Sequence, residues 1–288
     1  MISRRGFLKL SLSAAALSAI PTEVHAFSGY GYSKPTPIRD FQSVRADSMF
    51  TSRDYFEKIR KFNHAFKDDV IASPTELELI KSCCRKTNSI MRYVGFGNFN
   101  VLNFDDALKY SNNIDTLKPF TQAELDYIEM LFNRPASDYG FFGEKIFKNL
   151  TDKVDVSKMV KIPRSGHYVY KSESLSTYQK ITAEMGSLTL TSGVRSVVKQ
   201  MHLFLSKAVE TKGNLSMASR SIAPVGYSYH GIGDFDVGIK GWGFANFTDK
   251  FATTDEYSRL MKSGYMRIRY DRKNPYGVRF EPWHVKVV

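Results

Sequence analysis

The sequence predicts an α+β protein in which an N-terminal helical region precedes a small, largely antiparallel sheet with flanking helices. Apolar residues recur at helical spacing between about residues 50 and 150. After about residue 160, short runs alternate apolar and polar side chains, as half-buried strands do. The 288 residues, 42% of them hydrophobic and 14% aromatic, can bury a full core, so no disordered or fibrous class is indicated.

The first 26 residues are predicted to be an export signal. Ser3–Lys9 looks like a twin-arginine signal, because it matches the pattern of serine, two arginines, any residue, phenylalanine, leucine and lysine. An apolar run from Leu10 to Ile20 follows, and small residues stand at the cleavage positions near Ala26. The run is too short to span a bilayer comfortably. We therefore expect cleavage, a periplasmic location and no membrane span in the mature protein.

Residues 27–160 are expected to form an extended lead-in and then the helical region. Two capping signatures, Ser73–Glu76 and Thr121–Glu124, each begin a helix, and the second helix should end before Pro135. A further helix is predicted from an apolar stripe of Tyr55, Ile59, Phe62 and Phe66.

Cys83 and Cys84 are the only cysteines, and they are adjacent. A disulfide ring between neighbours is strained, so we expect two free thiols on a helix. No disulfide framework is predicted for this fold.

Residues 161–288 are expected to form a separate domain that carries the chemistry of the chain. It should hold helices near 194–208 and 254–262 and a serine-rich loop at 213–224. Four short strands are predicted, at 187–191, 235–239, 265–270 and 278–287.

The chain is strongly basic, with a formal net charge of +12. Without the first 26 residues, which carry three basic side chains and one acidic one, 12 − 2 leaves +10. Such a surface suits an anionic partner, and nucleic acid, an acidic membrane face and an acidic cell-wall polymer all qualify. Export from the cytoplasm argues against nucleic acid.

A zinc site is predicted from residues near and within the C-terminal strands. His230, Asp236 and His284 offer imidazole nitrogen and carboxylate oxygen, which zinc binds readily, and three such ligands leave one position for water. Glu281 would stay uncoordinated and take a proton from that water. The other histidines considered are expected to be surface or satisfied core residues: His64, His167 and His202.

Four blocks of sequence resemble one enzyme family. The blocks are Ser192–Ser196 with Gln200, Ser228–Gly233, Asp236–Gly238 and Glu281–His284. In this order they resemble the VanY-type D-alanyl-D-alanine carboxypeptidases, zinc peptidases that trim peptidoglycan stem peptides. The resemblance covers roughly residues 187–288. It implies zinc held by His230, Asp236 and His284, Glu281 as the base, and Arg195 near the scissile carbonyl or the substrate carboxylate.

The choice between two aspartates is open at this stage. The family usually has seven positions from histidine to aspartate, whereas His230 to Asp236 spans six and Asp234 lies at four. We align Asp236 because Val237-Gly238 follows it, with Asp234 as the substitute. In a strand both side chains would face the same side.

The expected function is that of a zinc-dependent carboxypeptidase acting on terminal D-alanine of peptidoglycan peptides. In amide hydrolysis, Arg195 would face the developing oxyanion, and Gln200 and Ser228 would hydrogen-bond the peptide. A cross-link endopeptidase and a non-catalytic wall-binding module are the alternatives. The sequence leaves open whether the bond joins two D-residues or an L- and a D-residue.

Overall fold

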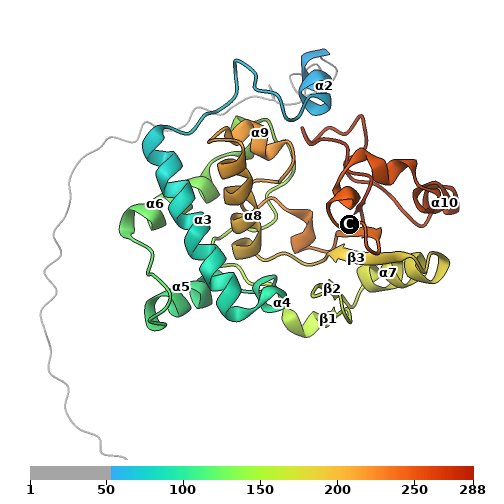
Figure 1. Ribbon diagram of the computed structural model, residues 1–288, viewed down its shortest axis with the longest axis horizontal. Helices are drawn as coiled ribbons and strands as arrows, with labels where there is room; N and C mark the ends of the chain where they lie inside the picture. Colours follow the sequence, from blue (N-terminus) through green and yellow to red (C-terminus); the bar gives the residue numbers. More distant parts are fainter. Residues whose placement is uncertain (1–52) are drawn as a thin grey trace, which may run out of the picture. The chain divides into compact units, whose positions relative to one another are not determined.

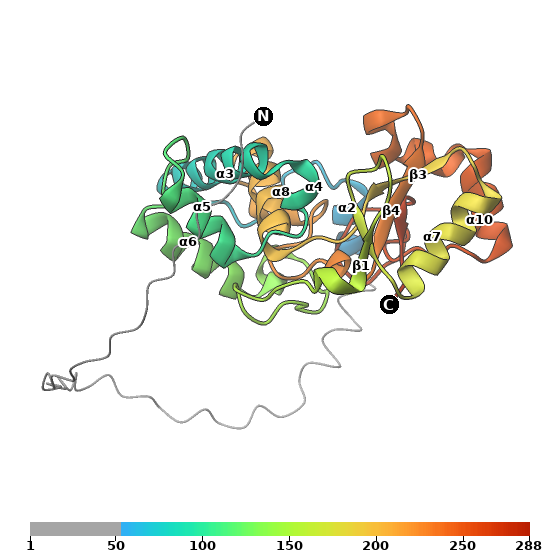
Figure 2. The ribbon, with the colours of Figure 1, turned by 90° about the horizontal axis from the view of Figure 1, so that it is seen from below.

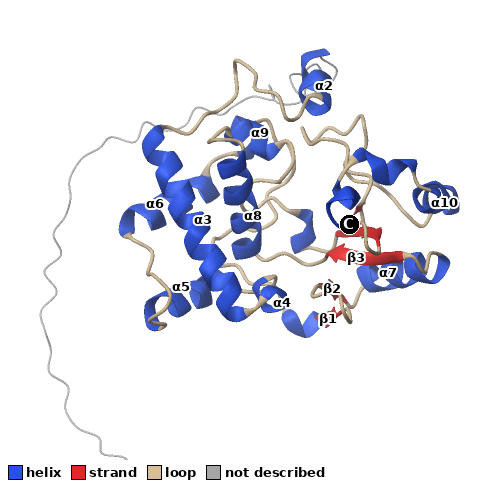
Figure 3. Ribbon diagram, in the orientation of Figure 1, coloured by secondary structure: helices blue, strands red, loops and turns tan. Residues whose placement is uncertain are grey.

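The computed structural model describes residues 53–288, and the predicted α+β class is confirmed (Figures 1 and 3). The α-helices are α2 (Arg53–Arg60), α3 (Pro74–Val94), α4 (Phe96–Phe99), α5 (Phe104–Asn113), α6 (Gln122–Asn133), α7 (Glu173–Glu184), α8 (Val197–Glu210), α9 (Leu215–Ser219) and α10 (Asp255–Ser263). The strands are β1 (Met159–Lys161), β2 (Tyr168–Tyr170), β3 (Leu188–Ser192), β4 (Phe235–Ile239) and β5 (His284–Val285). Short 3-10 helices are η1 (Ala136–Tyr139), η2 (Val156–Lys158), η3 (Tyr229–Gly231), η4 (Gly243–Phe247) and η5 (Asp249–Thr253).

Both predicted capping boxes begin helices. The Ser73 hydroxyl accepts from the Glu76 amide, and the Glu76 carboxylate accepts from the Ser73 amide. Thr121 and Glu124 make the same reciprocal pair at the start of α6, which ends at Asn133 before Pro135. Each box satisfies backbone donors that the first turn leaves free.

The helices share one hydrophobic core that crosses residue 160. Ile80 of α3 and Ile128 of α6 pack in the same cluster as Phe204 and Leu205 of α8. Figures 1 and 2 show α8 beside α3, in the part of the molecule that also holds α5 and α6. The domain boundary near residue 160 stays a prediction, and the structure adds that core packing continues across it.

The sheet is three-stranded and antiparallel, in the order β3-β4-β5. Its apolar residues, such as Leu190 and Val237, pack with Ile181 of α7 and Leu260 of α10 in a second core. Figure 2 shows α7 and α10 on this side of the molecule. β4 is buried almost throughout because both neighbours and both helices cover it.

One helix prediction and one loop prediction were wrong in part. α2 contains Tyr55 and Ile59 but ends at Arg60, so Phe62 and Phe66 lie beyond it. Arg279 lies over the Phe62 ring, and Lys58 and Arg220 over Phe66. The predicted loop at 213–224 contains α9, whose start is capped by Asn214.

Two strand predictions were also wrong. Residues 265–270 form only an isolated bridge, Ile268 to Val285, and within 278–287 only β5 is a strand. Arg269 breaks the expected alternation because it is buried with Tyr270, paired with the carboxylate of Asp234.

Cys83 and Cys84 are free thiols on α3, as predicted. Burial raises the pKa of Cys83 to about 12, so the thiol is unreactive at neutral pH. The predicted twin-arginine signal lies outside the described residues. Among residues 53–288, no helix combines the length and apolar character that crossing a bilayer requires.

Candidate metal centre

The predicted ligands meet beside strands β4 and β5 of the small sheet. Asp236 on β4 pairs directly with His284 on β5, and such opposite residues bring their side chains to the same face. His230 lies in η3, just before β4. All three are at least 97% buried, with exposed fractions of 0% for His230, 2% for Asp236 and 3% for His284.

The ligand atoms of the three side chains are spaced as tetrahedral coordination of a zinc ion requires. His230 Nε2 lies 3.4 Å and His284 Nδ1 lies 3.3 Å from Asp236 Oδ1. Two ligands about 2 Å from a zinc ion lie about 3.3 Å apart at the tetrahedral angle. Within residues 53–288, these three residues form the one group of His, Cys, Asp or Glu side chains whose ligand atoms all lie within 4.8 Å of one another.

The remaining ring nitrogens are held by other groups. His230 Nδ1 bonds to the Gly193 carbonyl at 2.8 Å, and His284 Nε2 bonds to Asp234 Oδ2 at 3.0 Å. These contacts place the free lone pairs at His230 Nε2 and His284 Nδ1, facing Asp236. His230 Nε2 and Asp236 Oδ1 have no hydrogen-bond partner among the described residues. A cation is what this set of atoms fits.

Gly193 is required where it lies. A Cβ atom there would meet the Tyr168 carbonyl oxygen at 2.0 Å. The close backbone approach lets the Val194 amide donate to that oxygen at 2.7 Å, while the Gly193 carbonyl holds His230. The sequence block Ser192–Ser196 thus orients a ligand that lies far along the chain.

The local field favours positive charge between the three residues. Burial, and then Arg195, lower the pKa of His230 to about 4, so its ring is neutral at pH 7. Burial alone would lower the pKa of His284, but its hydrogen bonds to Asp234 and Asp236 outweigh burial and raise it to about 9. Burial opposes ionisation of Asp236 too, yet the neighbouring histidines and Arg195 hold its pKa well below the usual range. The cluster therefore binds a proton tightly, and a metal ion would replace that proton.

The structure separates the two aspartates. Asp234 pairs with the guanidinium of Arg269 and accepts from the Val287 amide at 2.9 Å, so its oxygens are occupied. It lies behind His284 and is not part of the three-residue group. The geometry thus favours Asp236 as the ligand, with Asp234 orienting His284.

Glu281 lies beside the cluster without joining it. Its Oε2 is 3.8 Å from His284 Nδ1, and its Oε1 is 3.6 Å from Arg279 Nε. Burial raises the pKa of Glu281 to about 7, against the lowering effect of Arg279 and His284. A carboxylate with a pKa near neutrality can both accept and return a proton at pH 7.

Arg195 is anchored at the same cluster. It donates to Asp236 Oδ2 at 2.8 Å and to the Ser192 hydroxyl at 3.0 Å. The first contact occupies the aspartate oxygen that does not face the histidines. Arg195 therefore orients Asp236 and still has guanidinium donors for a substrate.

Gln200 and Ser228 are not brought to the cavity. Gln200 is fully buried in α8 and donates to the Ala223 carbonyl, and Ser228 is 3% exposed at the start of η3. His64 is exposed, and its carbonyl accepts from Arg220. His202 is buried and bonds to the Thr87 hydroxyl at 2.9 Å.

A cavity of about 520 Å³ opens beside the cluster. Asp236 and Glu281 lie in its wall, with Arg195. The other lining residues come from both halves of the molecule: Phe96, His167, Thr191, Ser192, Lys199, Leu203, Ser206, Lys207, Glu210, Ser221, Ile222, Phe244, Phe247, Arg279 and Trp283. Its volume suits a short peptide.

Sequence reasoning missed three cations of this wall: Arg279, Lys199 and Lys207. Arg279 precedes Glu281 by two residues, which is a signal available in the sequence. Lys199 follows Arg195 by four residues, in the first turn of α8, so its proximity to Arg195 was also readable. None of the three has a motif that would single it out among 41 basic residues.

Comparison with known proteins agrees with the sequence blocks. Residues 169–288 match the family described as VanY, D-alanyl-D-alanine carboxypeptidase. No curated protein matches the chain.

Three solved structures are similar to part of the chain. An LdcB LD-carboxypeptidase, described as revealing the basis of peptidoglycan recognition, is 22% identical over 46% of this chain and 68% of its own, with a TM-score of 0.39. A vancomycin-resistance D,D-pentapeptidase VanY in complex with Zn(II) is 21% identical to this chain. The match covers 47% of this chain and 80% of that structure's chain, with a TM-score of 0.37. VanYB in complex with D-alanine-D-alanine is 20% identical to this chain. The match covers 51% of this chain and 84% of that structure's chain, with a TM-score of 0.39.

The family match contains all three clustered residues and Glu281, and it begins before the first resembling block. Through residues 169–288, the chain is similar to the VanY-type D-alanyl-D-alanine carboxypeptidases.

Proposed function

We propose that this chain is a zinc-dependent carboxypeptidase that removes the terminal D-alanine from peptidoglycan stem peptides. The observation that carries the proposal is the convergence of His230, Asp236 and His284, with unpaired donor atoms, beside an uncoordinated Glu281. The cavity of about 520 Å³ gives a peptide access to these groups.

His230, Asp236 and His284 would hold the ion. Zinc, when bound, supplies Lewis-acid activation of water and of the peptide carbonyl. Glu281 takes one proton from the attacking water as the C–O bond forms. It then delivers that proton to the leaving amine as the C–N bond breaks, so a carboxylate and a free D-alanine result. Arg195, held at Asp236, contributes positive charge to the oxyanion.

Digestion of purified muropeptides, followed by mass spectrometry, tests the substrate. Loss of one terminal D-alanine from a pentapeptide supports the proposal, and release of D-alanine from a tetrapeptide instead indicates L,D-specificity. Cleavage of cross-linked dimers into monomers would indicate an endopeptidase.

Glu281→Gln separates an enzyme from a wall-binding module. The variant keeps the size of the side chain but cannot accept a proton. We expect turnover to fall by about 10²- to 10⁴-fold while zinc content stays at one per chain. Unchanged wall binding with no turnover in either protein would favour the binding module.

The proposed location is the periplasm, reached by the twin-arginine route. The support is the match of Ser3–Lys9 to that signal. Residues 1–26 fused to a reporter should export it in normal cells and not in cells without the twin-arginine machinery. Replacing Arg4 and Arg5 by lysine should abolish export, and export that continues would contradict this route.

A further inference from the structure

Lys199 is a buried cation in the wall of the metal-centre cavity. It is 6% exposed in the first turn of α8, four residues after Arg195. Four basic residues of fixed positive charge line the cavity: Arg195, Lys199, Lys207 and Arg279. These four residues differ in whether a carboxylate neutralises them, and this difference points to a role for Lys199.

Three of these cations are paired with carboxylates. Arg195 pairs with Asp236 at 2.8 Å, Lys207 with Glu210 at 2.6 Å, and Arg279 lies 3.6 Å from Glu281. Lys199 has no anionic partner among the described residues. Its ammonium lies instead over two rings, 4.7 Å from the centre of Phe96 and 5.8 Å from that of Phe99.

A buried ammonium without a counter-ion is costly. The two ring faces offset part of that cost and hold the side chain in place. Burial, and then Arg195, lower the pKa of Lys199 to about 8, so the side chain is still mostly charged at pH 7. A bound anion would relieve this cost.

The cavity wall also contains other unpaired polar atoms. Thr191 Oγ1, Ser221 Oγ and Arg279 Nε lack hydrogen-bond partners among the described residues, as does Asp236 Oδ1, which faces the two histidines of the cluster. Buried polar groups are usually paired, so their concentration here indicates a site that a polar ligand completes.

The wall extends along one face of α8. Lys199, Leu203, Ser206, Lys207 and Glu210 line the cavity at helical spacing. This length corresponds to about 16 Å, enough for about five extended peptide residues. Lys199 is the member of this row nearest in sequence to Arg195, which pairs with Asp236 of the cluster.

We propose that Lys199 forms a subsite for a carboxylate of the peptide substrate, and so helps to determine which peptides are accepted. The inference rests on the proposed function, because it assumes a peptide in this cavity. Two sources supply the carboxylate: the C-terminus of the peptide, or an acidic side chain further from the scissile bond.

Three synthetic peptides distinguish the sources. The first is N-acetylated Lys-D-Ala-D-Ala, the second is its C-terminal amide, and the third replaces lysine by diaminopimelate, which adds a side-chain carboxylate. Binding is measured by calorimetry on the zinc-loaded mature chain carrying Glu281→Gln, so that nothing is cleaved. Turnover of the acids is measured on the chain with Glu281 intact.

The parent protein should prefer one acid over its matched neutral partner by about 10- to 100-fold, the range for a hydrogen bond between charged groups. Lys199→Met should reduce that preference to within about twofold, and Lys199→Arg should retain most of it. Loss of the acid-over-amide preference identifies the C-terminus, and loss of the diaminopimelate-over-lysine preference identifies the side chain. Because each preference is a ratio within one variant, general destabilisation by the substitution cancels.

Lys207→Met is the matched control, since Lys207 lies on the same helix and cavity wall but is already neutralised by Glu210. Preferences that survive Lys199→Met, an equal loss in Lys207→Met, or no binding of any peptide would overturn the subsite. Cleavage that is independent of Lys199 would overturn the subsite but not the enzyme. A Lys199-dependent preference without cleavage by the unsubstituted chain would overturn the enzyme proposal but not the subsite.

Discussion

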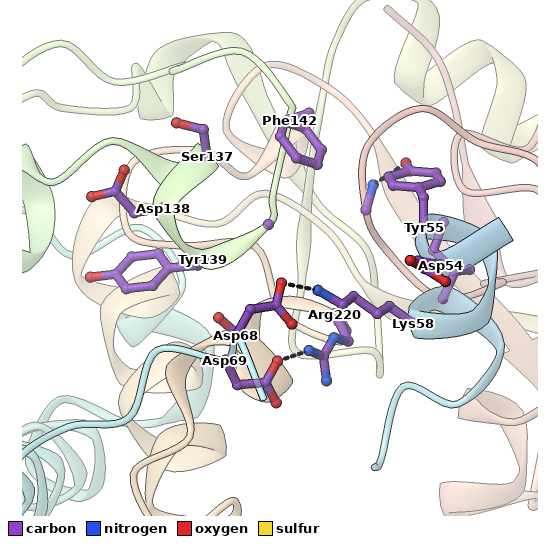
Figure 4. A pocket seen from close by; sticks show the side chains of 14 residues that line it. Asp54, Tyr55, Lys58, Asp68, Asp69, Ser137, Asp138, Tyr139, Phe142 and Arg220 are labelled. Atoms are coloured by element: carbon purple, nitrogen blue, oxygen red, sulfur yellow. Dashed lines mark hydrogen bonds and ion pairs between the residues drawn. The ribbon is translucent and has the colours of Figure 1, made fainter. Parts of the chain in front are cut away.

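Two cavities of similar volume differ in how the charged side chains in their walls are paired. The cavity near α2 has a volume of about 490 Å³, and its wall contains Asp68, Asp69, Arg220 and Lys58 (Figure 4). Figure 4 shows the two aspartates paired with Lys58 and Arg220. The metal-centre cavity, of about 520 Å³, has instead a cluster of unpaired donor and acceptor atoms.

The pairing of Asp69 is complete. Its Oδ1 meets Arg220, and its Oδ2 accepts from the Phe66 amide at 3.0 Å and from Asn214 at 2.7 Å. Arg220 also donates to the His64 carbonyl. A buried pair satisfied on every side joins distant segments and leaves nothing for a ligand.

The unpaired atoms of the two cavities differ in number and direction. In the cavity near α2, one of them belongs to a lining residue, Tyr139 Oη, and Figure 4 shows it pointing away from the ion pairs. Four line the metal-centre cavity. The comparison teaches that unmet hydrogen-bonding capacity, and not volume, distinguishes the metal-centre cavity from the cavity near α2.

Removing a cluster residue should have the largest effect. His284→Ala deletes a donor atom and should lower zinc from one per chain to a small fraction, with turnover reduced at least about 10³-fold. Metal analysis and muropeptide turnover measure both. His202→Gln is the matched control, because His202 is a buried histidine bonded to Thr87 outside the cluster. Equal zinc loss in both variants would contradict the assignment.

Breaking the Arg220–Asp69 ion pair should lower the stability of the fold without lowering the turnover of folded molecules. Arg220→Met leaves the Asp69 carboxylate buried without its main partner, which costs about 3 to 5 kcal/mol of unfolding free energy. Urea denaturation measures the loss. Turnover per folded molecule should stay within about twofold, and a large fall in turnover of the folded fraction would show that this cavity also serves the reaction.

Zinc removal should lower stability by a slightly smaller amount. With free zinc at 100 to 1,000 times its Kd, binding stabilises the folded state by about 3 to 4 kcal/mol. A chelator should therefore lower the thermal midpoint of the unsubstituted chain and of Glu281→Gln alike. His284→Ala should show no such shift, and a shift in that variant would indicate a different site.

The pKa values of two buried histidines shift in opposite directions. His202 lies against Thr87 outside both cavities, and His284 lies in the cluster. Burial, and then Lys199, lower the pKa of His202 to about 4, whereas hydrogen bonds raise that of His284 to about 9 in the cluster. As pH falls below about 6.5, unfolded His202 gains a proton that the folded residue refuses, so stability is lost. Between pH 7.5 and 5 this amounts to about 2 kcal/mol.

The measurement is urea denaturation at both pH values, with His202→Gln beside the unsubstituted chain. The variant should lose about 2 kcal/mol less on acidification. Identical pH dependence in the two proteins would show that His202 accepts a proton in the folded state.

Local signals determined the elements whose partners are close in sequence. The Ser73 and Thr121 capping boxes lie within four residues each, so both helix starts could be predicted. The alternation at Phe235–Ile239 likewise predicted β4. The family blocks narrowed the candidate metal ligands to two histidines and one of two aspartates before any fold was known.

Register decided between those aspartates. Both face His284, as alternation predicted, but Asp236 stands directly opposite it while Asp234 lies one diagonal step away. Asp234 also meets the guanidinium of Arg269, which comes from a segment 35 residues later. No spacing in the sequence reveals a cross-strand pairing of this kind.

The sequence by itself determined the class of fold, the helix caps and the set of candidate ligands, because these depend on local chemistry and composition. Tertiary structure alone decided which carboxylates are occupied, why Arg269 is buried, and which cation in the cavity lacks a partner. These outcomes depend on contacts between distant segments, where one counter-charge, such as Asp236 for Arg195 or Glu210 for Lys207, decides whether a buried charge is satisfied.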